Sequence, residues 1–177
     1  MNLPNLLTLF RILLIPVFLY FLFNGPIAYA LAAFVVAGLT DAIDGTLARM
    51  TGNITELGIL LDPLADKALV LSAFVALTVL GKVPAWLTVA IVLRDAVIVL
   101  GSAELYRRGR REDIRPVVLG KATTFFLFSL LVSALVGLYL KRDLSLTVYL
   151  AWVSALLIIA SSAQYMLRGY RMFVKNG

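Results

Sequence analysis

The chain has 177 residues, of which 62% are hydrophobic, and its 16 Lys and Arg against 10 Asp and Glu give a formal net charge of +6. Soluble domains are nearer 45–50% apolar, so the composition excludes an ordinary soluble domain and predicts an integral membrane protein with one domain, residues 1–177. The absence of Cys and His excludes disulfides, thiolate nucleophiles, Ser-His-Asp triads and His-ligated zinc.

Six apolar segments are each close to the length of about 20 residues that a transmembrane helix needs. The connections between them are short, so helices that follow one another in sequence should be antiparallel neighbours. The first segment has almost no charged leader and no small-residue cleavage site, which favours a retained helix over a signal peptide. We therefore predict an all-α protein with six transmembrane helices. The predicted spans are Leu6–Phe23, Ile27–Ala48, Ile59–Leu80, Ala85–Tyr106, Val117–Leu140 and Leu146–Leu167.

Lys and Arg are concentrated in the connections on one side of these spans, and such an excess is typical of the cytoplasmic side. Both termini are therefore predicted to be cytoplasmic, in a multi-pass protein of the bacterial inner (plasma) membrane. The positive charge favours contact with anionic lipid headgroups or phosphorylated substrates. Nucleic acid is not expected as a partner, because the basic residues flank apolar spans. The predicted inner side holds Arg49, Arg107, Arg108, Arg110, Arg111, Arg115, Arg168, Arg171 and Lys175, and the outer side holds Lys82, Lys141 and Arg142.

Four carboxylates interrupt the second and third apolar segments. Asp41 and Asp44 are spaced i,i+3, whereas Asp62 and Asp66 are spaced i,i+4, so each pair lies on one face of its helix. In antiparallel neighbours the two pairs would meet at similar depth, roughly 5–12 Å from the inner helix ends. The sequence thus predicts a polar pocket that opens to the cytoplasmic side.

An ionised Asp in a bilayer costs about 2.5–3.5 kcal/mol, so this pocket requires compensating charge. Carboxylates without His or Cys prefer hard cations, and two Mg²⁺ or Mn²⁺ ions would neutralise the four charges and serve phosphoryl chemistry. Spacing alone leaves two alternatives open. The carboxylates could form buried ion pairs with Arg49, Lys67 and Arg94, or they could relay ions in a transporter. Transporters often contain internal repeats, and none is recognisable here.

The acidic motif belongs to a longer pattern: Asp41-x-x-Asp44-Gly45-x-x-Ala48-Arg49, eight residues, then Gly58-x-x-x-Asp62-x-x-x-Asp66. This pattern resembles the signature of the CDP-alcohol phosphotransferase (phosphatidyltransferase) family in every fixed residue and gap. The similarity extends along the chain to Arg94-Asp95 and to the run Gly120–Thr124. Members of the family transfer a substituted phosphate from a CDP-linked lipid to an alcohol and release CMP.

The resemblance implies a role for each matching residue. It implies that Asp41, Asp44 and Asp62 are metal ligands, and that Asp66 is both a ligand and the general base for the acceptor hydroxyl. It also implies a CDP-diacylglycerol donor, surrounding membrane lipids and a homodimer. The residues that it places near the CDP-lipid are Asn5, Thr8, Gly45, Arg49, Thr55 and Gly58.

Two groups within the family are candidates for the acceptor. The opening run Asn2–Arg11 is similar to members that use glycerol 3-phosphate, and a phosphorylated acceptor needs a second anion site. Arg94 and Lys121 are candidates for this site, because each charge lies in or at the edge of an apolar span, although Asp95 or Glu104 could pair with Arg94 instead. The Asp95 position often holds Glu in those members, and the Leu61–Lys67 run also resembles members whose acceptor is phosphatidylglycerol. Glycerol 3-phosphate is favoured.

Overall fold

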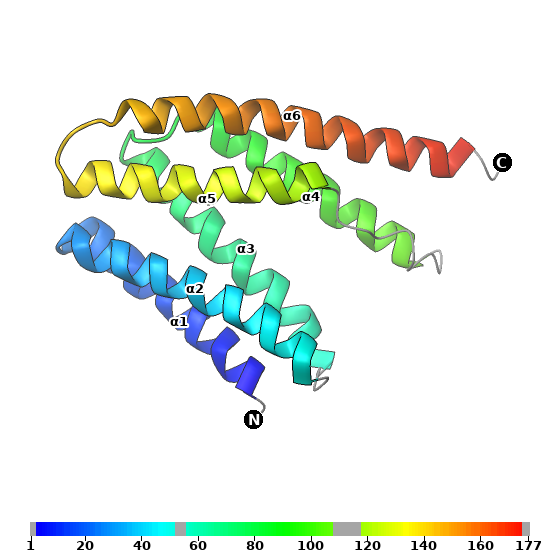
Figure 1. Cartoon of the computed structure of the whole chain (residues 1–177), viewed down its shortest axis with the longest axis horizontal. Coiled ribbons are helices and arrows are strands. Elements are labelled where there is room, and N and C mark those ends of the chain that lie inside the picture. Colours follow the sequence, from blue (N-terminus) through cyan, green and yellow to red (C-terminus); the bar gives the residue numbers. More distant parts are fainter. Residues whose placement is uncertain (1–2, 52–55, 108–117, 175–177) are drawn as a thin grey trace. The chain divides into compact units, whose positions relative to one another are not determined.

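The computed structural model of the chain describes residues 3–51, 56–107 and 118–174, with side chains for residues 9–40, 67–99, 101 and 119–165. These residues form helices and short connections without a β-strand, which confirms the predicted all-α class (Figure 1). Each of the predicted spans coincides with one helix to within a few residues at its start. The helices are α1 (Leu3–Asn24), α2 (Ile27–Thr51), α3 (Glu56–Val79), α4 (Ala85–Arg107), α5 (Val118–Tyr139) and α6 (Ser145–Val174).

The first of two compact units contains α1, α2, α3 and the segment Ala134–Asp143. Within it α1 packs against both α2 and α3. Phe18 of α1 and Phe34 of α2 are fully buried, and their ring centroids lie 5.8 Å apart in a tilted arrangement, a favourable geometry for aromatic pairs. Other buried apolar residues of this core are Leu22, Ala30, Ala37, Leu69, Ala73, Phe74, Leu77 and Leu135.

Two helix ends in this unit have the same hydrogen-bonding pattern. After α3, the Lys82 amide donates to the Leu77 carbonyl and the Gly81 amide donates to the Thr78 carbonyl, and Gly81 has a φ of 69°. This is the Schellman motif, which uses a left-handed residue to satisfy the last carbonyls of a helix. The end of α5 is similar, but there Lys141 occupies the left-handed position with a φ of 53°.

The second unit contains α4, the first part of α5 and α6, as residues Val83–Ser133 and Leu144–Gly177. α4 packs against α6, and the rings of Trp86 and Trp152 lie 5.7 Å apart. Small polar side chains join α5 to α6: Thr123 Oγ1 donates to the carbonyls of Leu119 and Leu157, at 2.7 and 3.4 Å. Such residues allow close helix contact where no water is available.

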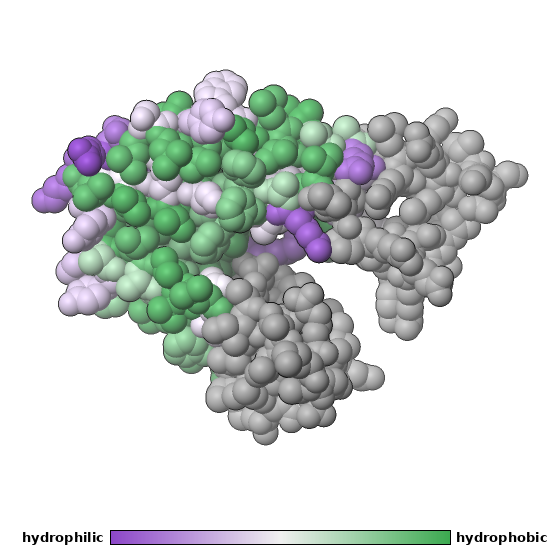
Figure 2. All heavy atoms as spheres, viewed as in Figure 1, coloured by the Kyte–Doolittle hydropathy of each residue, from purple (hydrophilic) through white to green (hydrophobic). Residues whose placement is uncertain are grey.

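The surface of the described part is largely apolar (Figure 2). Phe125, Leu156, Ile159 and Trp152 each expose more than three-fifths of their area, although side chains this large and apolar are usually buried in soluble proteins. Two helical segments are long and apolar enough to cross a membrane by length and composition, Leu119–Tyr139 and Ser145–Tyr165. Shorter apolar helical segments, among the described residues, are Leu9–Asn24, Ile27–Thr40 and Lys67–Val79.

Candidate active site

The acidic motif occupies two helices of the first unit. Asp41 and Asp44 lie in the second half of α2, and Asp62 and Asp66 lie in the first half of α3. The predicted i,i+3 and i,i+4 spacings therefore fall within continuous helices, so each pair lies on one face of its helix. The side chains of the four Asp residues lie outside the described part, so the predicted pocket stays a prediction.

Asp41 and Asp66 lie at equal distances, counted along their helices, from the connection between α2 and α3. Asp41 lies about 10 residues before the end of α2, and Asp66 lies about 10 residues after the start of α3. At about 1.5 Å per residue, each is roughly 15 Å from the connection that joins the two helices. α1 packs against both helices, so the four Asp residues belong to helices of one compact unit.

Arg11 is a residue that the sequence analysis did not single out as part of the site. Its side chain is 1% exposed. Arg11 lies 13 residues before the end of α1, and Asp41 lies 14 residues after the start of α2, so the two are at similar distances from the connection between these helices. A buried guanidinium in an apolar setting is costly unless anionic or polar groups compensate it. The sequence feature that could have indicated this residue is a single Arg within an otherwise apolar helix. Arg11 thus adds a buried positive charge to the unit that carries the acidic motif.

The donor set of the motif fits hard divalent cations. Four carboxylates on two helices of one unit offer only oxygen ligands, and the chain has no His or Cys to attract softer metals. Within the part of the chain whose side chains are described, no group of three or more acidic residues forms such a site. The four Asp residues are outside that part.

The residues predicted to surround the CDP-lipid also belong to the first unit. Asn5 and Thr8 lie in the first turns of α1, Gly45 and Arg49 lie near the end of α2, and Gly58 lies in the first turn of α3. Their side-chain positions, and Thr55 as a whole, lie outside the described residues. Their proposed contacts therefore stay predictions.

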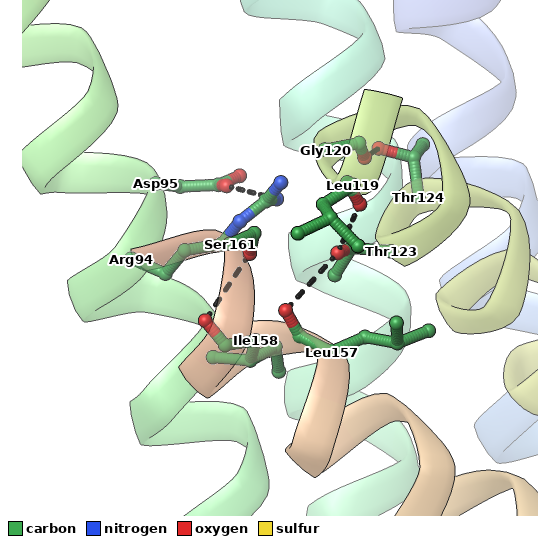
Figure 3. A network of polar contacts seen from close by, with 9 residues as sticks. All are labelled: Arg94, Asp95, Leu119, Gly120, Thr123, Thr124, Leu157, Ile158 and Ser161. Atoms are coloured by element: carbon green, nitrogen blue, oxygen red, sulfur yellow. Dashed lines mark hydrogen bonds and ion pairs between the residues drawn. The ribbon is translucent and has the colours of Figure 1, made fainter. Parts of the chain in front are cut away.

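The two residues predicted to bind the acceptor phosphate lie in the second unit. The Arg94 side chain is only 8% exposed, and its Nη1 donates to Asp95 Oδ1 at 3.0 Å. Lys121 is exposed in the first turn of α5. Figure 3 shows the Arg94 guanidinium between Asp95 and the start of α5, where Gly120 lies. The structure thus brings Arg94 close to the Gly120-Lys121 turn, and it pairs Arg94 with Asp95, one of the two partners that the sequence suggested.

Comparison with known sequences decides the family. A sequence model of the CDP-alcohol phosphatidyltransferases matches residues 1–160, which include both acidic helices, Arg94, Lys121 and the first half of α6. The chain belongs to the CDP-alcohol phosphatidyltransferase family. The resemblance drawn from the motif is therefore confirmed, and membership identifies the protein as one of a family of membrane transferases.

Three relatives within the family illustrate its range. The chain is 34% identical to a CDP-diacylglycerol–glycerol-3-phosphate 3-phosphatidyltransferase of Aquifex aeolicus, over 99% of this chain and 100% of that protein. It is 43% identical to a probable phosphatidylglycerophosphate synthase of Mycobacterium tuberculosis over 61% of this chain, a match that spans about half (54%) of that relative. It is also 37% identical to a CMP-forming cardiolipin synthase of Streptomyces coelicolor, over 71% of this chain and 60% of that protein.

Proposed function

We propose that this protein transfers the phosphatidyl group of CDP-diacylglycerol to a hydroxyl of glycerol 3-phosphate and releases CMP, as a step in phospholipid biosynthesis. The observation that carries the proposal is the end-to-end match with the Aquifex aeolicus relative, whose name states this reaction. A Bacillus subtilis relative of the same name, 34% identical over 70% of this chain and 71% of that protein, adds support.

In this proposal the acidic motif holds two divalent cations, Mg²⁺ or Mn²⁺. Asp41, Asp44 and Asp62 act as ligands, and Asp66 is a ligand as well as the general base. The bound cations supply charge neutralisation for the diphosphate of the donor and for the departing CMP. The donor set described above, oxygen atoms only, is the chemical support for this choice of ions.

The residues of the chain have separate tasks in the transfer. Asp66 accepts the proton of the acceptor hydroxyl. At the same time the hydroxyl oxygen of the acceptor bonds to the phosphorus that carries the diacylglycerol. The bond between that phosphorus and the oxygen of CMP then breaks, and CMP leaves with the electron pair. Arg49 binds the donor phosphates through its guanidinium fork, and Gly45 leaves room for the nucleotide. Asn5, Thr8, Thr55 and Gly58 line the same CDP-lipid site.

The acceptor is proposed to bind through its phosphate at Arg94 and Lys121. A side chain as deeply buried as that of Arg94, carrying a permanent charge, requires a strong anionic partner. Asp95 accepts a hydrogen bond from one nitrogen of the Arg94 guanidinium, Nη1. A phosphate group would accept from the others, and bidentate recognition of phosphate is the geometry that Arg favours.

The proposal places the protein in the bacterial inner membrane as a homodimer of chains with six transmembrane helices and cytoplasmic termini. The apolar surface of the described residues supports a lipid environment. Trp86 and Trp152 lie near the starts of α4 and α6, where this topology puts the outer interface, and Trp is enriched at such interfaces.

A cardiolipin synthase of the same family is the second candidate, because the Streptomyces coelicolor relative carries that name. Its acceptor would be phosphatidylglycerol, a lipid with a phosphodiester and no phosphate monoester. An ion-coupled transporter that uses the Asp cluster is the alternative from another class, and family membership disfavours it.

A panel of acceptors separates these candidates. Purified protein, CDP-diacylglycerol and Mg²⁺ are incubated with glycerol 3-phosphate, phosphatidylglycerol, inositol phosphate or serine, and CMP release is measured. The proposal predicts release with glycerol 3-phosphate alone. Release with phosphatidylglycerol alone would identify the second candidate, and no release with any alcohol would contradict both.

A further inference from the structure

Gly120 forms an open backbone surface where three helices of the second unit meet. A Cβ built on Gly120 would lie 3.1 Å from the hydroxyl oxygen of Tyr165 in α6 and 3.7 Å from Nη2 of Arg94 in α4. Gly120 itself is buried in the first turn of α5. Two polar side-chain atoms from different helices therefore converge on one small region that no side chain of α5 fills.

The donors in this region have unused hydrogen-bonding capacity. Arg94 uses Nη1 for Asp95, whereas its Nε is buried and has no hydrogen-bond partner among the described residues. The Tyr165 hydroxyl lies next to Gly120 and makes no hydrogen bond to any of the described residues. Arg94 Nε is therefore a buried donor without an acceptor, which is uncommon and costly in a folded protein. The Tyr165 hydroxyl, on a half-buried side chain, is a second donor near the same guanidinium. Together they indicate a site for a ligand that accepts hydrogen bonds.

The positive charges near Gly120 make an anion the best fit for this ligand. The Arg94 guanidinium is permanently charged, and its side chain is 8% exposed. Lys121, which follows Gly120 in α5, adds a second positive charge. A guanidinium, an ammonium group and a hydroxyl donor together suit a phosphate group.

We infer that Tyr165 is a further ligand of the acceptor phosphate, and that Gly120 is needed because a side chain there would occupy the space between Tyr165 and Arg94. This inference rests on the proposed function, since it assigns a residue to the same acceptor site. It also supplies a basis for selectivity. A phosphate monoester offers three terminal oxygens to these donors, whereas the phosphodiester of a lipid acceptor offers two and carries less charge.

Two variants test the inference in the full-length protein. Tyr165→Phe removes only the hydroxyl group, and Gly120→Ala introduces the Cβ that would lie 3.1 Å from it. Each variant is expected to raise the KM for glycerol 3-phosphate roughly tenfold, the effect of one lost hydrogen bond to a charged group. The KM for CDP-diacylglycerol and the melting temperature should stay at their wild-type values. Tyr149→Phe is the matched control, because Tyr149 lies on the same helix and is 65% exposed; this variant should behave as wild type.

A second readout does not depend on turnover. Glycerol 3-phosphate is added to purified wild-type protein and to Tyr165→Phe, and the ligand concentration that gives half of the maximal rise in melting temperature is measured. The inference predicts a half-maximal concentration roughly tenfold higher for the variant. This assay also applies to Gly120→Ala if Tyr165→Phe melts at a lower temperature than wild type.

The outcomes distinguish this inference from the function on which it rests. Unchanged glycerol 3-phosphate affinity in both variants, with wild-type CMP release, would overturn the role of Tyr165 and leave the proposed reaction intact. Equal losses of affinity for donor and acceptor would also overturn it, because they would indicate a general structural role. Wild-type protein that releases no CMP with glycerol 3-phosphate would overturn the proposed reaction itself.

Discussion

Arg94 and Asp95 are consecutive residues of α4, and Arg94 Nη1 donates a hydrogen bond to Asp95 Oδ1 over 3.0 Å. Consecutive residues of a helix do not face each other, so the two side chains must turn toward a common side. Asp95 remains 31% exposed while the Arg94 side chain is 8% exposed. Asp95 therefore orients the guanidinium and leaves most of its donors available.

Replacement of Arg94 should weaken acceptor binding selectively. Arg94→Ala is expected to raise the KM for glycerol 3-phosphate at least tenfold, because it removes a charged hydrogen bond donor from the phosphate, with little change for CDP-diacylglycerol. Arg94→Lys should recover only part of this loss, since Lys lacks the planar fork. Steady-state kinetics with each substrate varied in turn measure both effects. An unchanged acceptor KM in Arg94→Ala would reduce Arg94 to a structural partner of Asp95.

Asp66→Asn should remove the general base while leaving a site for the donor. We expect the transfer rate to fall by about 10²–10⁴-fold, the contribution typical of general base catalysis, with metal-dependent binding of CDP-diacylglycerol partly retained. Asp143→Asn is the control, because Asp143 is an acidic residue that is 84% exposed and pairs with Lys82. CMP release and donor binding are measured for both. Full activity of Asp66→Asn would refute the base assignment.

Removal of divalent cations should stop the reaction completely. Excess EDTA is expected to abolish CMP release, and Mg²⁺ or Mn²⁺ added beyond the chelator should restore it. Zn²⁺ should restore much less, because the proposed ligands are all carboxylates. Turnover that persists in excess EDTA would contradict the proposed metal pocket.

Sequence alone predicted the helices and the family, because both depend on local patterns. Apolar segments of about 20 residues define the helices, and the spacing from Asp41 to Asp66 defines the family. The Tyr165 contact with Gly120 could not be predicted, because these residues are far apart in sequence and belong to different helices. Burial of Arg11 likewise depends on how α1 packs, and no pattern in its own sequence states which face is covered.

The helix end at Lys141 offers a test of the fold that is independent of catalysis. Lys141 holds a left-handed conformation, with a φ of 53°, which costs a residue with a Cβ about 1 kcal/mol relative to Gly. Lys141→Gly should therefore raise the free energy of unfolding by up to about 1 kcal/mol. Gly81→Ala is the reverse control: Gly81 has a φ of 69° and open space around it, so the change should destabilise through the backbone alone. Thermal unfolding in detergent measures both, and a lower melting temperature for Lys141→Gly would contradict the proposed helix end.

The most direct test of the proposed reaction is the identity of its lipid product when both acceptors compete. Purified protein with CDP-diacylglycerol and Mg²⁺ is given glycerol 3-phosphate and phosphatidylglycerol in equal amounts, and the product is identified by mass spectrometry. We predict phosphatidylglycerophosphate, a lipid that retains the phosphate monoester of its acceptor. Cardiolipin as the main product would contradict the account, because the acceptor would then carry no phosphate monoester for Arg94 and Lys121 to bind.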